Sequence, residues 1–265
     1  MDAETRVDLV ARIKVAVPAA MLALFLVIAG GGIFAAGMLV LGAIMLHELF
    51  LMFEGANPSR LGGLIGLIGL IVAAQLGDQG DVLMAMMASF PVVFVLILVQ
   101  PRGGAPGISV TMLAIAWIGL ALAHAVLLRR LPHGEAILID ILVGTFLGDT
   151  GAYLGGRAIG RTKLAPRISP NKTVEGLGCG FIVAVVAVWS AGLYQDWMSG
   201  TDALILGVAV AIMAPLGDLF ESYLKRDAGT KDTGKIFGAH GGALDRLDAV
   251  MFTVVTGFYV WLALL

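Results

Sequence analysis

The sequence contains few charged residues and a single cysteine, and both scarcities narrow the kind of protein it encodes. Asp, Glu, Lys and Arg make up 14% of the 265 residues, whereas hydrophobic residues make up 59%. Soluble globular domains carry roughly 25% charged residues, so this composition excludes an ordinary soluble domain and predicts a membrane protein. The single cysteine, Cys179, excludes a disulfide within the chain and is typical of a small packing residue.

An excess of one charge is also missing, and so is a secretory signal. The formal net charge is −2, which favours no nucleic acid partner. The opening stretch, MDAETRVDLVARIK, is amphipathic and mixed in charge, and no small-residue cleavage pattern closes the apolar run that follows it. We therefore expect no nucleic acid among the partners, and we expect the first apolar run to stay in the membrane.

Long apolar runs are what the sequence has in abundance. A helix needs about 20 mainly apolar residues to cross the hydrocarbon. The predicted spans are Val15–Gly31, Ile33–Phe53, Leu61–Leu76, Val82–Val99, Ile108–Leu128, Ala136–Leu154, Leu177–Tyr194, Ala203–Leu224 and Leu247–Leu265. The fold class we expect is therefore an all-α integral membrane protein, a polytopic helical bundle with about nine transmembrane helices.

The basic residues test this arrangement independently of hydropathy. Of the 17 Lys and Arg, 15 fall on the side of the N-terminus, and only Arg129 and Arg130 fall on the other side. Since basic loops stay in the cytoplasm, we expect a cytoplasmic N-terminus. The distribution of polar residues divides the chain into two regions. Residues 1–134 are apolar, and we expect them to form a scaffold that serves as a dimer contact or a lipid chamber. Residues 135–265 contain two polar cytoplasmic loops, and we expect them to form the catalytic region.

The first polar loop follows a helix that carries Asp149 near its end, where an ion is costly unless it has a partner or a function. In the segment SPNKTVEG, Ser169, Lys172 and Thr173 precede the next apolar run. A helix N-terminus with hydroxyls and a cation favours a bound phosphate, but the same residues are also typical of helix capping. The glycines between these two segments suit either close helix packing or a backbone exposed to phosphate.

The second polar loop lies between the last two apolar runs. Asp218, Glu221, Ser222 and Lys225 share one face of the helix that enters it. Asp245 and Asp248 are again three residues apart, at the start of the final helix with Arg246 between them. Carboxylate oxygens without nitrogen or sulfur ligands suit Mg²⁺ or Mn²⁺. His240 has no partner at ligand spacing, so we interpret it as either a hydrogen-bond donor to phosphate or a loop-stabilising group.

Acidic pairs with Lys, Arg and glycine turns are what phosphoryl or nucleotidyl transfer needs, because cations offset the charge of the polyphosphate. Intramembrane carboxylates also mark ion paths. The lysines and arginines among them speak against a cation pathway, since a cation would meet repulsion there.

The stretch from Ser222 to Asp248, SYLKRDAGTKDTGKIFGAHGGALDRLD, closely resembles the signature of the phosphatidate cytidylyltransferase (CDP-diacylglycerol synthase) family. Every polar element of that signature is present, and the departure is Ala243, where the family usually has a larger aliphatic residue. The upstream stretch GDTGAYLGGRAIGRTKLAPRISPNKTVEG is also similar to the family's pattern.

The resemblance implies an integral membrane enzyme that converts CTP and phosphatidate to CDP-diacylglycerol and pyrophosphate, depends on Mg²⁺ or Mn²⁺ and forms a homodimer. Together with the placement of the basic residues, it leads us to expect a multi-pass protein of the inner (plasma) membrane with its active site at the cytoplasmic face. The resemblance leaves a second cation, monovalent or divalent, as an alternative. Asp218 and Asp245 match metal ligands. The implied catalytic residues are Lys225, Arg226, Lys231, Asp232 and Asp248; those for phosphate and CTP binding are Ser169, Lys172, Thr173, His240, Arg246 and Asp149. The alternatives are a polyprenol kinase, another lipid cytidylyltransferase or an ion transporter.

Overall fold

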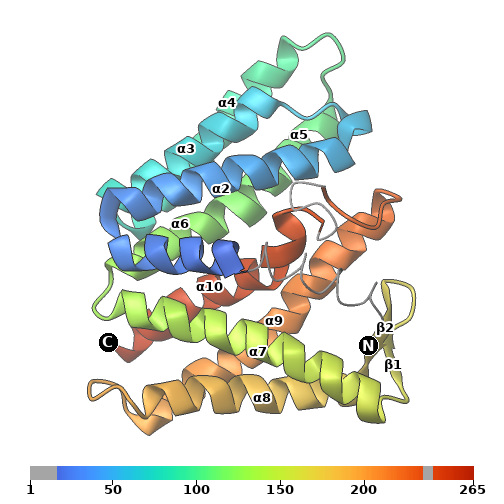
Figure 1. Cartoon of the computed structure of the whole chain (residues 1–265). Coiled ribbons are helices and arrows are strands. Elements are labelled where there is room, and N and C mark those ends of the chain that lie inside the picture. Colours follow the sequence, from blue (N-terminus) through green and yellow to red (C-terminus); the bar gives the residue numbers. More distant parts are fainter. Residues whose placement is uncertain (1–16, 235–240) are drawn as a thin grey trace.

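The fold is a bundle of apolar helices, seen in a computed structural model that describes residues 17–234 and 241–265 (Figure 1). Within these described residues, seven helices are long and apolar enough to cross a membrane. They are α2 (Gly31–Met52), α4 (Gln79–Leu98), the continuous helix Ala105–Arg130, α7 (Gly134–Ile159), α8 (Val174–Gly192), α9 (Gly200–Asp227) and α10 (Leu244–Leu264). Two shorter apolar helices, Val17–Ala29 and α3 (Arg60–Leu76), accompany them. The all-α class is confirmed, whereas the number of crossings and the side of the N-terminus stay predictions.

Each predicted span coincides with one of these helices, with boundaries that shift by a few residues. Glycines alone separate the first two predicted spans, and there the chain does break: Gly30 and Gly31 have φ of 62° and 51°. A side chain is strained in that left-handed conformation, so glycine permits the break. A Cβ on Gly30 would also lie 2.7 Å from Nη2 of Arg129.

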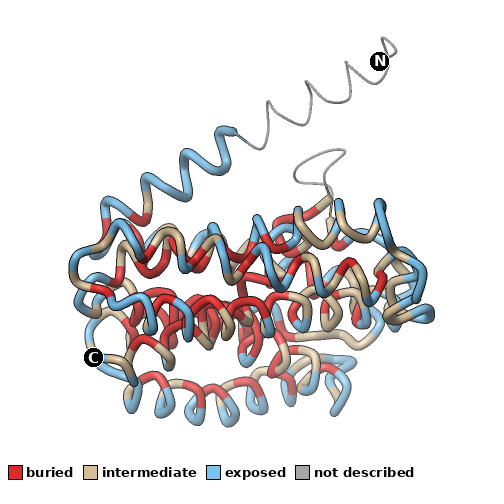
Figure 2. Tube along the Cα trace, turned by 90° about the horizontal axis from the view of Figure 1, so that it is seen from below, coloured by how far each residue is buried: buried red, intermediate tan, exposed pale blue. Residues whose placement is uncertain are grey.

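The helix Ala105–Arg130 runs through the middle of the bundle. It consists of α5 (Ala105–Ala114), a π-helical segment (Ile115–Gly119) and α6 (Leu120–Arg130). Every residue from Ala121 to Leu128 is buried, and α6 packs against α2, α3, α7 and α10. Figure 2 shows the buried residues gathered along the inner helices, while the outer faces are exposed. The exposed residues are largely hydrophobic, as expected for surfaces that face lipid.

Arg129 and Arg130 bind the carbonyl ends of two neighbouring helices. The Arg129 guanidinium donates to the carbonyl oxygens of Val27 and Ile28, at 2.6 and 3.2 Å, and that of Arg130 donates to those of Ala74 and Gly77. Cations stabilise helix C-termini because they satisfy carbonyls that have no partner within the helix. These two arginines therefore serve the fold at the end of the bundle opposite to the start of α10.

The described strands are limited to a hairpin between α7 and α8, at the right of Figure 1. Strand β1 (Lys163–Ala165) pairs antiparallel with β2 (Ser169–Thr173), with Lys163 opposite Thr173 and Ala165 opposite Ser169. The polar residues of the first predicted loop thus stand on an ordered hairpin beside the end of α9.

Small residues let α7 and α8 approach closely. A Cβ on Gly180 of α8 would lie 2.7 Å from the carbonyl oxygen of Gly148 and 2.8 Å from the Cβ of Ala152, both in α7. A Cβ on Gly155 would meet Cys179. Packing therefore accounts for the spaced glycines and for the lone cysteine, in agreement with the packing interpretation of the sequence.

Replacing Gly180 by Ala tests this packing. We expect Gly180→Ala to destabilise the protein, because overpacking against backbone atoms costs about 1–3 kcal/mol. Gly178→Ala is the matched control on the same helix, since a Cβ there has nothing within 4 Å and alanine favours a helix by about 1 kcal/mol. Thermal unfolding in detergent should give a lower midpoint for Gly180→Ala than for Gly178→Ala; the reverse order would contradict the packing account.

Candidate active site

Lys225, near the end of α9, lies between two carboxylates from two helices. Its Nζ is 2.6 Å from Oε2 of Glu221, one turn earlier on α9, and 2.8 Å from Oδ1 of Asp245 on α10. Glu221 is fully buried, and the Lys225 side chain is 14% exposed. The shared helix face predicted from the sequence is therefore present, and it meets the acidic start of α10.

Three hydrogen-bond donors from the loop before α10 hold one carboxylate oxygen of Asp245. Its Oδ2 accepts hydrogen bonds from the N–H of Thr233 at 2.9 Å, the hydroxyl of Thr233 at 2.9 Å and the N–H of Gly242 at 2.8 Å. Gly241 has a φ of 80°, and a Cβ on it would lie 2.6 Å from Oδ2 of Asp245. The close backbone approach predicted for the glycine turn is thus present, with Asp245 as the group approached.

A second ion pair ties the β-hairpin to α9. Lys172 of β2 forms an ion pair with Asp218 of α9, and the hydroxyl of Ser222 donates to Oδ1 of Asp218 at 3.3 Å. Asp149 of α7 lies within electrostatic range of both Lys172 and Asp218. These residues, far apart in sequence, form one polar cluster beside Lys225.

Asp248 lies near both ion pairs. It is within electrostatic range of Asp218, Glu221 and Lys225. Gly217, next to Asp218, permits this approach, because a Cβ there would lie 2.6 Å from the carbonyl oxygen of Asp248. Asp218 and Asp245, the two predicted metal ligands, therefore belong to one end of the α9–α10 pair.

The hydroxyl of Thr173 has a capping role. It accepts the N–H of Gly176 at 3.1 Å as the N-cap of α8, and Thr173 is 8% exposed. Glu175 accepts the N–H groups of Arg161 and Thr162, which closes the base of the hairpin. The capping interpretation of this segment is confirmed for Thr173, whereas phosphate contact stays a prediction for it and for Ser169, which stands at the start of β2.

The remaining predicted residues lie at the rim of the cluster. Arg226 donates from Nε to the carbonyl oxygen of Ile168 at 3.1 Å, a second link between α9 and the hairpin. Lys231 and Asp232 are exposed, and their side chains form no hydrogen bond or ion pair with the described residues. Arg246 is exposed in the first turn of α10. His240 lies outside the described residues.

The donor set is chemically suited to a hard cation. Asp218, Glu221, Asp245 and Asp248 offer only carboxylate oxygens, the ligand type of Mg²⁺. Within residues 17–234 and 241–265, no three acidic, His or Cys side chains are grouped closely enough to hold a metal by themselves. Mg²⁺ is usually held by one or two carboxylates together with substrate phosphates and water, so the arrangement fits an ion that arrives with a nucleotide.

Sequence reasoning missed Glu48 of α2. Its carboxylate accepts the N–H groups of Ala243 and Leu244, at 3.0 and 2.9 Å, and the residue is 1% exposed. The available signal was an acidic residue inside a predicted apolar span, which is costly without a partner.

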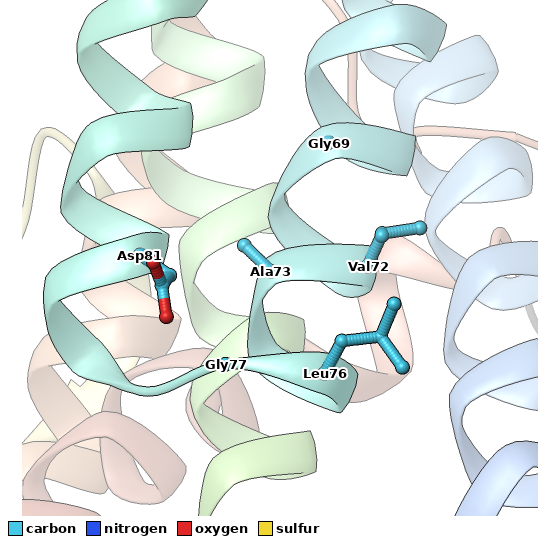
Figure 3. Close-up of a pocket in the computed structure, with 6 residues that line it drawn as sticks. All are labelled: Gly69, Val72, Ala73, Leu76, Gly77 and Asp81. Atoms are coloured by element: carbon cyan, nitrogen blue, oxygen red, sulfur yellow. The ribbon is translucent and has the colours of Figure 1, made fainter.

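A hollow between α3 and α4 is remote from this cluster. Figure 3 shows its lining: Gly69, Val72, Ala73, Leu76, Gly77 and Asp81. Asp81 is committed to the cap of α4, where its Oδ2 accepts the N–H of Asp78 at 2.9 Å. The hollow lies at the end of the bundle bound by Arg130, so it contributes nothing to the cluster.

The chain matches known proteins over nearly its whole length. The profile of the cytidylyltransferase family matches residues 10–264. A phosphatidate cytidylyltransferase of Bacillus subtilis is 35% identical, with 97% of this chain and 99% of the relative covered. A phosphatidate cytidylyltransferase of Staphylococcus epidermidis is 30% identical over 92% of this chain and 95% of the relative. One from Helicobacter pylori is 43% identical over 45% of this chain and 44% of the relative.

The match extends over the N-terminal helices and over both segments that build the cluster of Lys172, Asp218, Lys225 and Asp245. The full-length similarity and the polar site at one end of the bundle agree, and the chain belongs to the phosphatidate cytidylyltransferase family.

Proposed function

We propose that the protein transfers the cytidylyl group of CTP to phosphatidate and so forms CDP-diacylglycerol and pyrophosphate. The single observation that carries this proposal is the full-length family match, which includes the clustered carboxylates and lysines. In this reaction a phosphate oxygen of phosphatidate forms a bond to the α-phosphorus of CTP. The bond from that phosphorus to the oxygen bridging the α- and β-phosphates breaks, and pyrophosphate leaves with the electron pair.

The reaction does not require a strong general base. The phosphate of phosphatidate is already an anion near pH 7, so the barrier is mainly the repulsion between two anions. Lys172 and Lys225 are placed to offset that repulsion, because each enters the cluster from a different element. When a triphosphate binds, its oxygens compete with Asp218 and Asp245 for these ammonium groups. Preorganised charges of this kind stabilise the transition state without reorganising at the moment of reaction.

We propose Mg²⁺, or Mn²⁺ in its place, as the metal cofactor, with Asp218 and Asp245 as its protein ligands. Such an ion neutralises polyphosphate charge and polarises the phosphorus that is attacked. The residues of the chain do the positioning: Thr233 and Gly242 hold Oδ2 of Asp245, and Ser222 orients Asp218. A second cation is compatible with the four carboxylates of the cluster.

We place the site at the cytoplasmic face of the inner membrane, where CTP is available. The support is the distribution of basic residues, since Lys172, Lys225 and Arg226 belong to the basic side of the bundle, and Arg129 and Arg130 to the other. The cluster joins the ends of apolar helices, so phosphatidate reaches it laterally from the bilayer while CTP enters from water. A homodimer is proposed on the family resemblance alone.

Product analysis tests the reaction. Purified protein given CTP, phosphatidate and Mg²⁺ should form CDP-diacylglycerol and pyrophosphate in equal amounts, measured by lipid chromatography and a pyrophosphatase-coupled assay. Formation of CDP and a phosphorylated lipid from a polyprenol would indicate a kinase. Flux of metal ions into proteoliposomes without CTP would indicate a transporter, and either result without CDP-lipid formation would refute the proposal.

Chelation tests the metal proposal. If Asp218 and Asp245 hold a divalent metal as proposed, excess EDTA should abolish turnover, and added Mg²⁺ or Mn²⁺ should restore it. Transfer at the full rate in excess chelator would show that the lysines and arginines alone suffice.

Substitution of Asp245 tests its assignment. Asp245→Asn removes the charge that faces Lys225, and we expect kcat to fall about 100-fold or more, the range seen when a preorganised electrostatic group is lost. Asp202→Asn is the matched control, because Asp202 lies in the first turn of α9 at the opposite end of that helix and is bound by Ser199. Both variants should elute as folded protein, and a wild-type rate for Asp245→Asn would remove that residue from the site.

A further inference from the structure

A buried acid of the N-terminal half holds the start of α10. Glu48 lies on α2 and is 1% exposed. Its Oε1 accepts the N–H of Ala243 at 3.0 Å, and its Oε2 accepts the N–H of Leu244 at 2.9 Å. The first N–H groups of a helix lack partners within it and carry partial positive charge. A carboxylate that binds two of them is therefore well accommodated in an otherwise apolar setting.

Two glycines, Gly234 and Gly242, lie close to this carboxylate. A Cβ on Gly234 or on Gly242 would lie 2.5 Å from a carboxylate oxygen of Glu48. Two glycines thus let the backbone pass close to the acid on both sides of the segment that leads into α10. Any larger residue at either position would push Glu48 away from the amides that it binds.

The turn held by Glu48 also holds Asp245. The N–H of Gly242 donates to Oδ2 of Asp245 at 2.8 Å, while the next two amides donate to Glu48. Three successive amides therefore bind two carboxylates from different helices. A shift of this turn would move Asp245 relative to Lys225, which binds its other oxygen at 2.8 Å.

We propose that Glu48 is a positioning residue for the active site, acting through the turn at residues 241–244 to orient Asp245. The inference rests on the proposed function. Among the described residues, the hydrogen bonds of Glu48 go to the backbone of the turn, and none goes to a side chain of the predicted nucleotide site. Glu48 gives the region of residues 1–134 an indirect part in catalysis, since α2 supplies the acid that positions a residue at the start of α10.

The test compares Glu48→Gln with the wild type. A glutamine keeps the volume but has one acceptor oxygen, so its NH₂ group would face one of the two amides. We expect kcat for CDP-diacylglycerol formation to fall about 10- to 100-fold, because small misplacements of reacting groups cost rates of this order. The Mg²⁺ concentration for half-maximal rate should rise, and amide hydrogen exchange in a peptide covering residues 241–250 should become faster.

Asp140→Asn is the matched control. Asp140 is a buried acid on α7, 3% exposed, that accepts a hydrogen bond from Gln195 at 2.8 Å at the other end of the bundle. At temperatures well below both thermal midpoints, Asp140→Asn should keep the wild-type kcat and Mg²⁺ requirement. If Glu48→Gln also keeps both, Glu48 contributes only to stability and the proposal is overturned.

A shorter acid extends the test. If Glu48→Gln cannot be purified folded, Glu48→Asp takes its place, because one methylene less leaves it unable to reach both amides. A raised Mg²⁺ requirement and lower kcat support the proposal, and wild-type values overturn it. If the wild-type protein forms no CDP-lipid, the proposed function fails; hydrogen exchange then decides on Glu48, and an unchanged rate for residues 241–250 in the variant overturns its positioning role.

Discussion

The sharing of Lys225 between Glu221 and Asp245 is the contact on which the candidate site depends. A charge buried among apolar helices is costly unless it is paired. Here one ammonium group satisfies a carboxylate from each of two helices, at 2.6 and 2.8 Å. The pairing therefore joins the end of α9 to the start of α10.

The surrounding structure serves this contact by bringing backbones close together. Gly217 lets α9 approach α10 beside Asp248, and Gly180 lets α8 approach α7, so that the hairpin between α7 and α8 reaches the end of α9. Lys172 and Arg226 then connect the hairpin to α9. Lys172 and Lys225 form ion pairs with carboxylates, and the oxygens of a bound triphosphate would be alternative partners for them. Under the proposed function, the same residues stabilise the fold before the substrate arrives and offset its charge afterwards.

The sequence predicted correctly those features that depend on a single helix or loop. Hydropathy located the apolar helices, and the helical period placed Asp218, Glu221 and Lys225 on one face. Residues that act across elements were not predictable in this way. The Lys172–Asp218 pair depends on how the hairpin folds back, and the hydrogen bonds of Glu48 join positions almost 200 residues apart. Thr173 illustrates a third case, since capping and phosphate binding require the same residue types.

Under the proposed function, CTP meets a lipid phosphate at the charged cluster formed by the hairpin, α9 and the start of α10. The most direct test is an experimental structure with Mg²⁺ and a CTP analogue that cannot be cleaved at the α-phosphorus. The account predicts the triphosphate between the hairpin and the start of α10, with Asp218 and Asp245 on the metal and Lys172 and Lys225 turned to phosphate oxygens. A nucleotide bound elsewhere, with both lysines still on their carboxylates, would contradict it.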